Sequence, residues 1–136
     1  MASAMSECVA GNWREAKDHA DRALQLCDFD RDAARICGLL AWAPHWYWAL
    51  GMPEQAAATS LRGLEIARRT ARPFDVVWAL TGGSCGIILT GDTKRALDWN
   101  REAREIAREH AMKFAEAAPC NIWGGAALIA DGQFEE

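Results

Sequence analysis

Small and apolar residues recur along the chain at the spacing of a helix. In three segments a small residue is followed seven positions later by another, and apolar residues come next at helical spacing. The pairs are Ala16 and Ala23, Ala56 and Gly63, and Ala96 and Ala103. Residues seven apart lie on one face of a helix. We expect these faces to be close helix contacts, because a bulkier side chain there would overpack them.

The same pattern predicts a chain that is helical almost throughout. Ala, Leu, Arg and Glu are abundant and β-branched residues are few, which favours helix over strand. The expected helices are near residues 2–10, 12–27, 31–50, 53–71, 74–90, 93–110 and 113–131. Pro44 falls inside one of them, where it is expected to kink the helix.

Glycines punctuate this pattern at regular intervals and indicate an internal repeat. Gly11-Asn-Trp-Arg-Glu-Ala16 recurs as Gly51-Met-Pro-Glu-Gln-Ala56 and as Gly91-Asp-Thr-Lys-Arg-Ala96, and a fourth start begins at Gly132. Successive glycines are 40, 40 and 41 residues apart. Glycine accepts the left-handed conformation that closes a helix, so Gly51, Gly91 and Gly132 are each expected to end one. Pro53 suits the first turn of the next helix, and Asp92 and Thr93 are candidate N-caps.

These motifs resemble tetratricopeptide repeats, which are stacked helix-turn-helix units. The units are about 40 residues long rather than the usual 34. This longer form is similar to the helical region C-terminal to the ATPase module of bacterial signalling proteins. That group includes proteins with an adenylate or guanylate cyclase domain and large ATP-dependent transcription regulators. The most similar stretches are Trp48 to Ala56, Leu64 to Arg68 and Arg72 to Phe74.

The resemblance implies an all-α fold, a right-handed α-solenoid of antiparallel helix pairs with about three repeats and partial ends. Residues 1–136 would form one domain with repeats starting near 11, 51, 91 and 132. Neither end has a polar capping unit, so we expect the chain to be part of a longer array. It contains neither a P-loop nor a cyclase catalytic segment. Any such activity would therefore reside in a parent region outside this stretch.

Charge and cysteine content narrow the partners further. The net charge of −4 offers no footprint for nucleic acid, and no run of about 18 apolar residues suggests a membrane span. The first residues lack the features of a signal peptide. Five cysteines without a C-x-x-C pair indicate free thiols in a reducing compartment, which favours a cytoplasmic location.

Motifs that carry chemistry are weak in this sequence. Residues Gly82 to Gly86 match the G-x-S-x-G pattern of a hydrolase, with Ser84 or Cys85 as nucleophile, but the match lies within a predicted helix. His19, His45 and His110 fall in different repeats, so no metal site is expected. We expect no cofactor and no catalytic residue. Arg68, Arg69 and Arg72 leave open an anion-binding role beside the simpler one of a solvated helix face.

Tryptophan is the unusual residue, with seven copies, of which Trp42, Trp46 and Trp48 cluster around His45. These rings either pack between repeats or form an aromatic binding patch. In tetratricopeptide units the first helix of each pair lines the concave face. If that geometry holds, the candidate binding residues are Ala41, His45 and Trp48 in one unit and Trp78, Thr81 and Cys85 in the next.

The sequence thus favours a non-catalytic scaffold that binds a peptide or protein domain on its concave face. The alternative is a small-ligand sensor with an aromatic pocket near Trp42, Trp46 and Trp78. Two hypotheses remain. The chain could be a hydrolase, or it could be a purely structural spacer whose exposed ends self-associate. The identity of the partner is not encoded in any motif.

Overall fold

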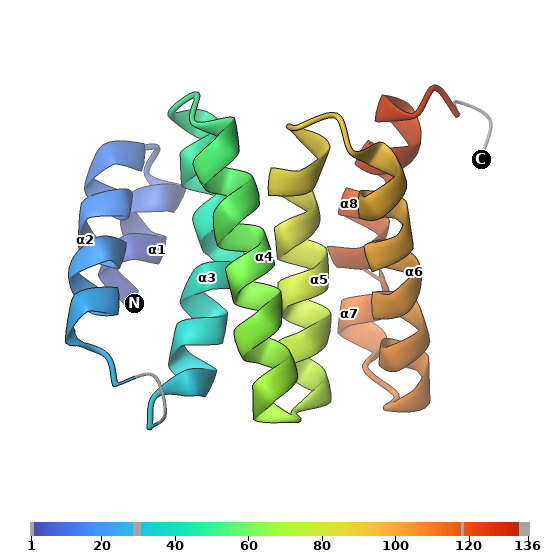
Figure 1. The fold of residues 1–136 in the computed structure, drawn as a ribbon, viewed down its shortest axis with the longest axis horizontal. Helices are drawn as coiled ribbons and strands as arrows, with labels where there is room; N and C mark the ends of the chain where they lie inside the picture. Colours follow the sequence, from blue (N-terminus) through green and yellow to red (C-terminus); the bar gives the residue numbers. More distant parts are fainter. Residues whose placement is uncertain (1, 29–30, 118, 134–136) are drawn as a thin grey trace.

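The computed structural model describes residues 2–28, 31–117 and 119–133, and within them the regular structure is all α-helical. This confirms the all-α prediction. The helices follow one another through short connections (Figure 1). They are α1 (Ala2–Val9), α2 (Trp13–Leu26), α3 (Ala33–Ala49), α4 (Pro53–Thr70), α5 (Pro73–Ile88), α6 (Thr93–Glu109), α7 (Lys113–Ala117) and α8 (Pro119–Ala130).

Most expected helices occur within a few residues of their predicted bounds. In the segment 113–131 the described residues are helical at Lys113–Ala117 (α7) and at Pro119–Ala130 (α8), and residue 118 between them lies outside the described residues. Pro44 lies within the continuous helix α3. The fourth repeat start extends into residues 134–136, outside the described residues.

The predicted glycine turns are confirmed. Gly11, Gly51, Gly91 and Gly132 have φ angles of 82°, 70°, 80° and 80°, in the left-handed region. At Gly51 the backbone N–H of Met52 donates to the carbonyl of Tyr47, which closes the end of α3. Asp92 caps α6 by accepting a hydrogen bond from the backbone N–H of Arg95.

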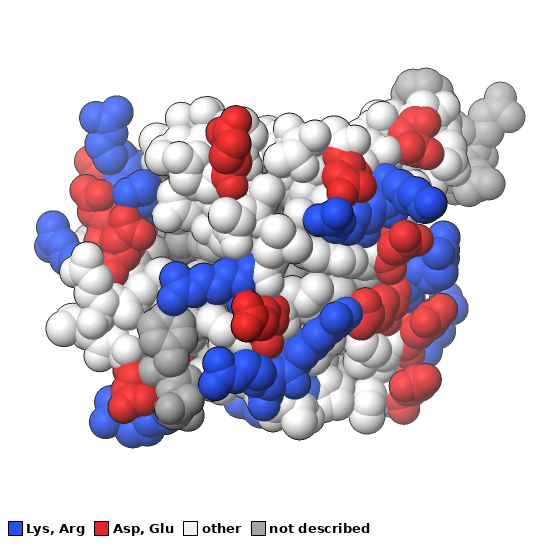
Figure 2. All heavy atoms as spheres, viewed as in Figure 1, with Lys and Arg blue, Asp and Glu red and all other residues white. Residues whose placement is uncertain are grey.

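The helices form two rows (Figure 1). We call α2, α4 and α6, which lie nearest the viewer, the front row, and α3, α5, α7 and α8 the back row. Helix α5 is central, since it packs against α3, α4, α6 and α8. Front-row helices carry many charges, and in Figure 2 basic and acidic side chains lie in groups among uncharged ones on this face. The long back-row helices carry almost none: α3 and α5 have one charged residue each and α8 has none, while the five-residue α7 has two.

Glycines allow α5 to approach its neighbours at backbone distance. A Cβ atom on Gly82 would overlap the carbonyl oxygen of Ala41 in α3. A Cβ atom on Gly86 would lie 2.6 Å from the carbonyl oxygen of Ala56 in α4. The glycines that weaken helix propensity in this segment are therefore required by packing. The G-x-S-x-G match is a small-residue contact surface of α5.

Two clusters of buried side chains fill the interior. The larger spans α3 to α8 and includes Leu40, Leu80 and Trp99. The smaller joins α1 and α2 to α3 around Trp46, which is 1% exposed. None of the helices in the described residues is long and apolar enough to cross a membrane.

Candidate binding cavity

An apolar cavity of about 230 Å³ lies among the back-row helices. Four helices contribute to it: α3, α5, α7 and α8. Its lining residues are Ala41, Trp42, His45, Trp78, Thr81, Gly82, Phe114, Ile122 and Trp123. In α3 the residues Ala41 and Trp42 precede His45 by one helical turn, and in α5 Trp78 precedes Thr81 and Gly82 by one turn, so each helix presents one face to the cavity.

Aromatic rings form the walls of this cavity. On one side His45 lies between Trp42 and Trp123, with ring centroids 5.2 Å and 5.0 Å away. On the other side Trp78 stacks with Phe114 at 6.4 Å. These separations are those of favourable ring pairs, so the walls support one another.

The space exists because small residues meet at the closest point of α3 and α5. Gly82 lies against the backbone of Ala41. Neither residue has a side chain large enough to fill the cavity that both of them line. Trp42 and Trp78 are the next large side chains on the two helices. The small residues Ala41 and Gly82 therefore account for both the close contact of the two helices and the cavity beside it.

Two side chains on the rim are apolar and exposed to solvent. Phe114 is 69% exposed and Ile122 is 62% exposed. Exposed apolar side chains at the rim of an apolar cavity are a feature found at binding surfaces.

The polar groups in the cavity are few. His45 Nδ1 lies 3.1 Å from the carbonyl oxygen of Trp42, one turn earlier in α3. Burial lowers the pKa of His45, which favours the neutral ring, while the hydrogen bond to Trp42 opposes this shift. The hydroxyl of Thr81 donates to the carbonyl of Val77 at 2.8 Å.

A second hollow of about 380 Å³ lies on the other side of Trp42 and Trp78, which line both. It is more polar than the first, since Arg35, Arg72 and Asp75 contribute to it. Asp75 is 6% exposed, and its Oδ2 atom is 3.6 Å from Nε of Arg72.

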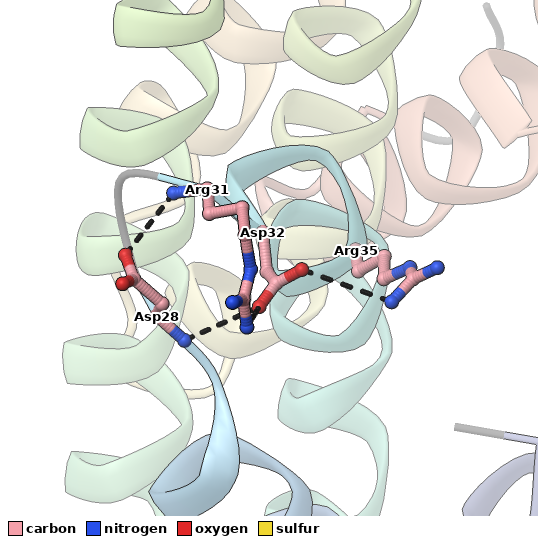
Figure 3. A network of polar contacts seen from close by, with 4 residues as sticks. All are labelled: Asp28, Arg31, Asp32 and Arg35. Carbon is pink, nitrogen blue, oxygen red and sulfur yellow. Dashed lines mark hydrogen bonds and ion pairs between the residues drawn. The ribbon is translucent and has the colours of Figure 1, made fainter.

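Arg35 joins this hollow to a polar network at the start of α3 (Figure 3). Asp32 pairs with Arg31 at 3.1 Å and with Arg35 at 3.7 Å, and accepts a hydrogen bond from the backbone N–H of Asp28. The hydrogen bond from Arg31 is the main cause that lowers the pKa of Asp32. The network thus links Asp28, after the end of α2, to Arg31, Asp32 and Arg35 at the start of α3.

Four of the six residues proposed from the sequence line the apolar cavity: Ala41, His45, Trp78 and Thr81. The other two lie elsewhere. Trp48 is 54% exposed, one turn beyond His45, and Cys85 is buried, one turn beyond Thr81. Phe114, Ile122 and Trp123 were missed, because the helical pattern alone does not show that α7 and α8 close the cavity.

Ser84 and Cys85 have the environment of packing residues. Ser84 is fully buried in the middle of α5, where its hydroxyl donates to the carbonyl of Leu80 and accepts from the amide of Asn100. A nucleophile elbow instead requires a turn between a strand and a helix. Burial raises the pKa of Cys85 to about 12, so its thiol stays protonated. Within the described residues no group of His, Cys, Asp and Glu could hold a metal ion.

No family model matches the chain, and neither a curated protein nor a solved structure matches it.

Proposed function

We propose that the chain is a non-catalytic interaction module whose back-row cavity binds one apolar or aromatic side chain of a partner peptide or protein domain. The observation that carries this proposal is an aromatic cavity with an exposed apolar rim, formed by Phe114 and Ile122. Aromatic anchors that fill such pockets contribute much of the affinity of protein interfaces.

The size of the cavity favours a single side chain over a free ligand. Pockets for drug-sized ligands are roughly 300–1,000 Å³. At about 230 Å³ the cavity is smaller than this range, and is close to the volume of one large side chain. The remainder of a partner segment would lie along the apolar rim.

The proposed architecture is a right-handed solenoid of antiparallel helix pairs, similar to tetratricopeptide repeats, with the back row on the concave face. The left-handed glycines at intervals of about 40 residues support this arrangement, as does the packing of α5 against both α3 and α8. We place the module in a larger signalling or transcription-regulatory protein. A reducing, cytoplasmic setting is supported by its five free cysteines.

A small-ligand sensor is the second candidate function. The observation that favours it is that Trp42 and Trp78 line both hollows, so that an elongated aromatic effector could contact both. A metabolite panel tested by thermal shift distinguishes the two functions. Stabilisation by a free effector, with no peptide binding, would favour the sensor.

The test of the proposed function is a screen of fluorescent 12-residue peptides with Trp, Tyr, Phe, Leu or Ala at the centre, read by anisotropy. Hits are then measured with Ile122→Ser and Ile129→Ser. Both isoleucines lie in α8 and are 62% exposed, but only Ile122 lines the cavity. Loss of one apolar rim contact is expected to weaken binding about fivefold, since burying an exposed isoleucine contributes on the order of 1 kcal/mol.

Binding weakened by Ile122→Ser and unchanged by Ile129→Ser would support the cavity as the site. Equal effects of the two substitutions would contradict it. A screen in which central Ala peptides bind as tightly as central aromatic ones would also exclude an anchor side chain.

A further inference from the structure

Two residues that line the apolar cavity have side chains that can accept a hydrogen bond, His45 and Thr81, whereas the indole N–H groups of its three tryptophans can only donate. Thr81 is 1% exposed, and its hydroxyl already donates to the carbonyl of Val77 at 2.8 Å within α5. The acceptor that the cavity offers to a partner is therefore His45.

The hydrogen bond to Trp42 fixes which nitrogen of His45 carries the proton. A carbonyl oxygen can only accept, so Nδ1, at 3.1 Å from the oxygen of Trp42, must be the donor. The neutral ring then carries no proton on Nε2. In the described residues Nε2 takes part in no hydrogen bond, and none of the residues that line the cavity carries a charge that would favour the imidazolium. His45 is thus an acceptor without a donor, held between the rings of Trp42 and Trp123.

We propose that the anchor side chain of the partner is an aromatic ring that carries its own hydrogen-bond donor, a tryptophan or tyrosine, and that it donates to Nε2 of His45. This inference rests on the proposed function and makes His45 the residue that determines specificity in the cavity. The partner is a peptide segment with such a residue on its surface.

The cavity is complementary both to the ring of such an anchor and to its donor group. The walls formed by Trp42, Trp78 and Trp123 accept the face or edge of a ring. A phenylalanine or leucine anchor would cover Nε2 with apolar atoms, exclude water from it and leave this acceptor unsatisfied, which is unfavourable. A site that hydrogen-bonds an N–H or O–H group discriminates against the analogue that lacks it.

The test compares two pairs of probes that differ in the donor. The probes are the N-acetyl amides of tyrosine and phenylalanine, and those of tryptophan and 1-methyltryptophan. Their binding to the full chain is followed by backbone amide NMR shifts, together with the ring ¹⁵N shifts of His45. We expect the donor of each pair to bind about five- to tenfold more tightly, which corresponds to one hydrogen bond. The ¹⁵N resonance of Nε2 should move upfield only with the donors.

Substitutions at His45 provide the matched controls. In His45→Gln the side-chain amide oxygen can take the place of Nε2, so the preference for tyrosine over phenylalanine should be retained. In His45→Phe the acceptor is removed, so this preference should reverse in favour of the more apolar ring. Amide spectra of the variants show whether each is folded. If a variant does not fold, the Nε2 shift measured in the unsubstituted chain still tests the proposal.

The outcomes separate this inference from the proposed function. Donor-dependent binding lost in His45→Phe and an upfield Nε2 shift support both. Equal binding of tyrosine and phenylalanine amides at the cavity, with Nε2 unmoved, would overturn the role of His45 and leave the function intact. Amide shifts that map away from the cavity for every probe would overturn both.

Discussion

Helices α5 and α6 pack side by side but have opposite surfaces. Helix α5 has one charged residue, Asp75, whereas α6 has nine. An apolar helix must be covered on every side, and α5 is covered by α3, α4, α6 and α8. The cavity lies where these neighbouring helices leave part of α5 uncovered. Helix α6 needs cover on one face only, and its charges face solvent (Figure 2).

Packing and ion pairing therefore contribute to stability in different parts of the molecule. Substitutions on α5 and the back row should change stability and binding strongly, because they alter packing against neighbouring backbones. Substitutions among the front-row charges should change little, because exposed ion pairs are screened by water and salt.

Gly82→Leu should have the largest effect. The new side chain would overlap the carbonyl oxygen of Ala41, which belongs to a helix backbone and has little freedom to yield. We expect a loss of more than about 3 kcal/mol in the free energy of unfolding, measured by urea denaturation. Gly125→Ala is the control, since a Cβ atom there meets nothing within 4 Å. It should stabilise α8 by up to about 1 kcal/mol. Equal destabilisation by both would contradict the described contact.

Asn100→Ala should destabilise the chain less, by about 1–3 kcal/mol. The amide of Asn100 donates to Ser84 in α5 at 2.9 Å and to the carbonyl of Ala96 at 3.0 Å. This is the buried polar link between the apolar and the charged helix. In a double-mutant cycle with Ser84→Ala, the two losses should not add. Simple additivity would mean that the hydrogen bond contributes nothing.

His45 should introduce a pH dependence that its glutamine variant lacks. Because burial lowers the pKa of His45, the unfolded chain binds a proton more readily than the folded chain. Stability from this group is present above the unfolded pKa of about 6.5 and is lost as the pH falls below it, by at most about 1.4 kcal/mol per pH unit. The difference in unfolding free energy between the unsubstituted chain and His45→Gln should shrink from pH 7.5 to pH 5.5. A constant difference would contradict a lowered pKa of His45 in the folded chain.

Arg68→Ala should have the smallest effect. Arg68 pairs with Glu102 at 3.0 Å between α4 and α6, but its side chain is 57% exposed. We expect a loss of about 0.2–1 kcal/mol that vanishes in 1 M salt. A loss comparable with that of Asn100→Ala would show that front-row charges stabilise the fold as much as back-row packing does.

The helices and their glycine turns could be predicted because they depend on local sequence. Gly51 and Gly91 end helices because each adopts the left-handed conformation that the turn after the helix requires. The same reasoning did not single out Ala71 and Ala111, which adopt φ angles of 53° at the ends of α4 and α6 without being glycine. There the surrounding structure imposes a conformation that the residue itself does not favour.

The cavity could be predicted only in part, because its residues come together through tertiary packing. Trp42, Trp46 and Trp48 are neighbours in sequence but have three environments. Trp42 lines the cavity, Trp46 is buried against α1 and α2, and Trp48 is 54% exposed. Helical periodicity places Ala41 and His45 on one face but does not show that Phe114 and Trp123 lie opposite them.

The tryptophans themselves can report most directly whether a partner binds in the apolar cavity. The chain is labelled with 5-fluorotryptophan, each ¹⁹F resonance is assigned by a Trp→Phe substitution, and the tightest peptide from the screen is added. The account predicts shifts at Trp42, Trp78 and Trp123, which line the cavity, with Trp13 and Trp99 unchanged. Shifts confined to Trp48, or to Trp13 and Trp99, would place the partner outside the cavity and contradict the account.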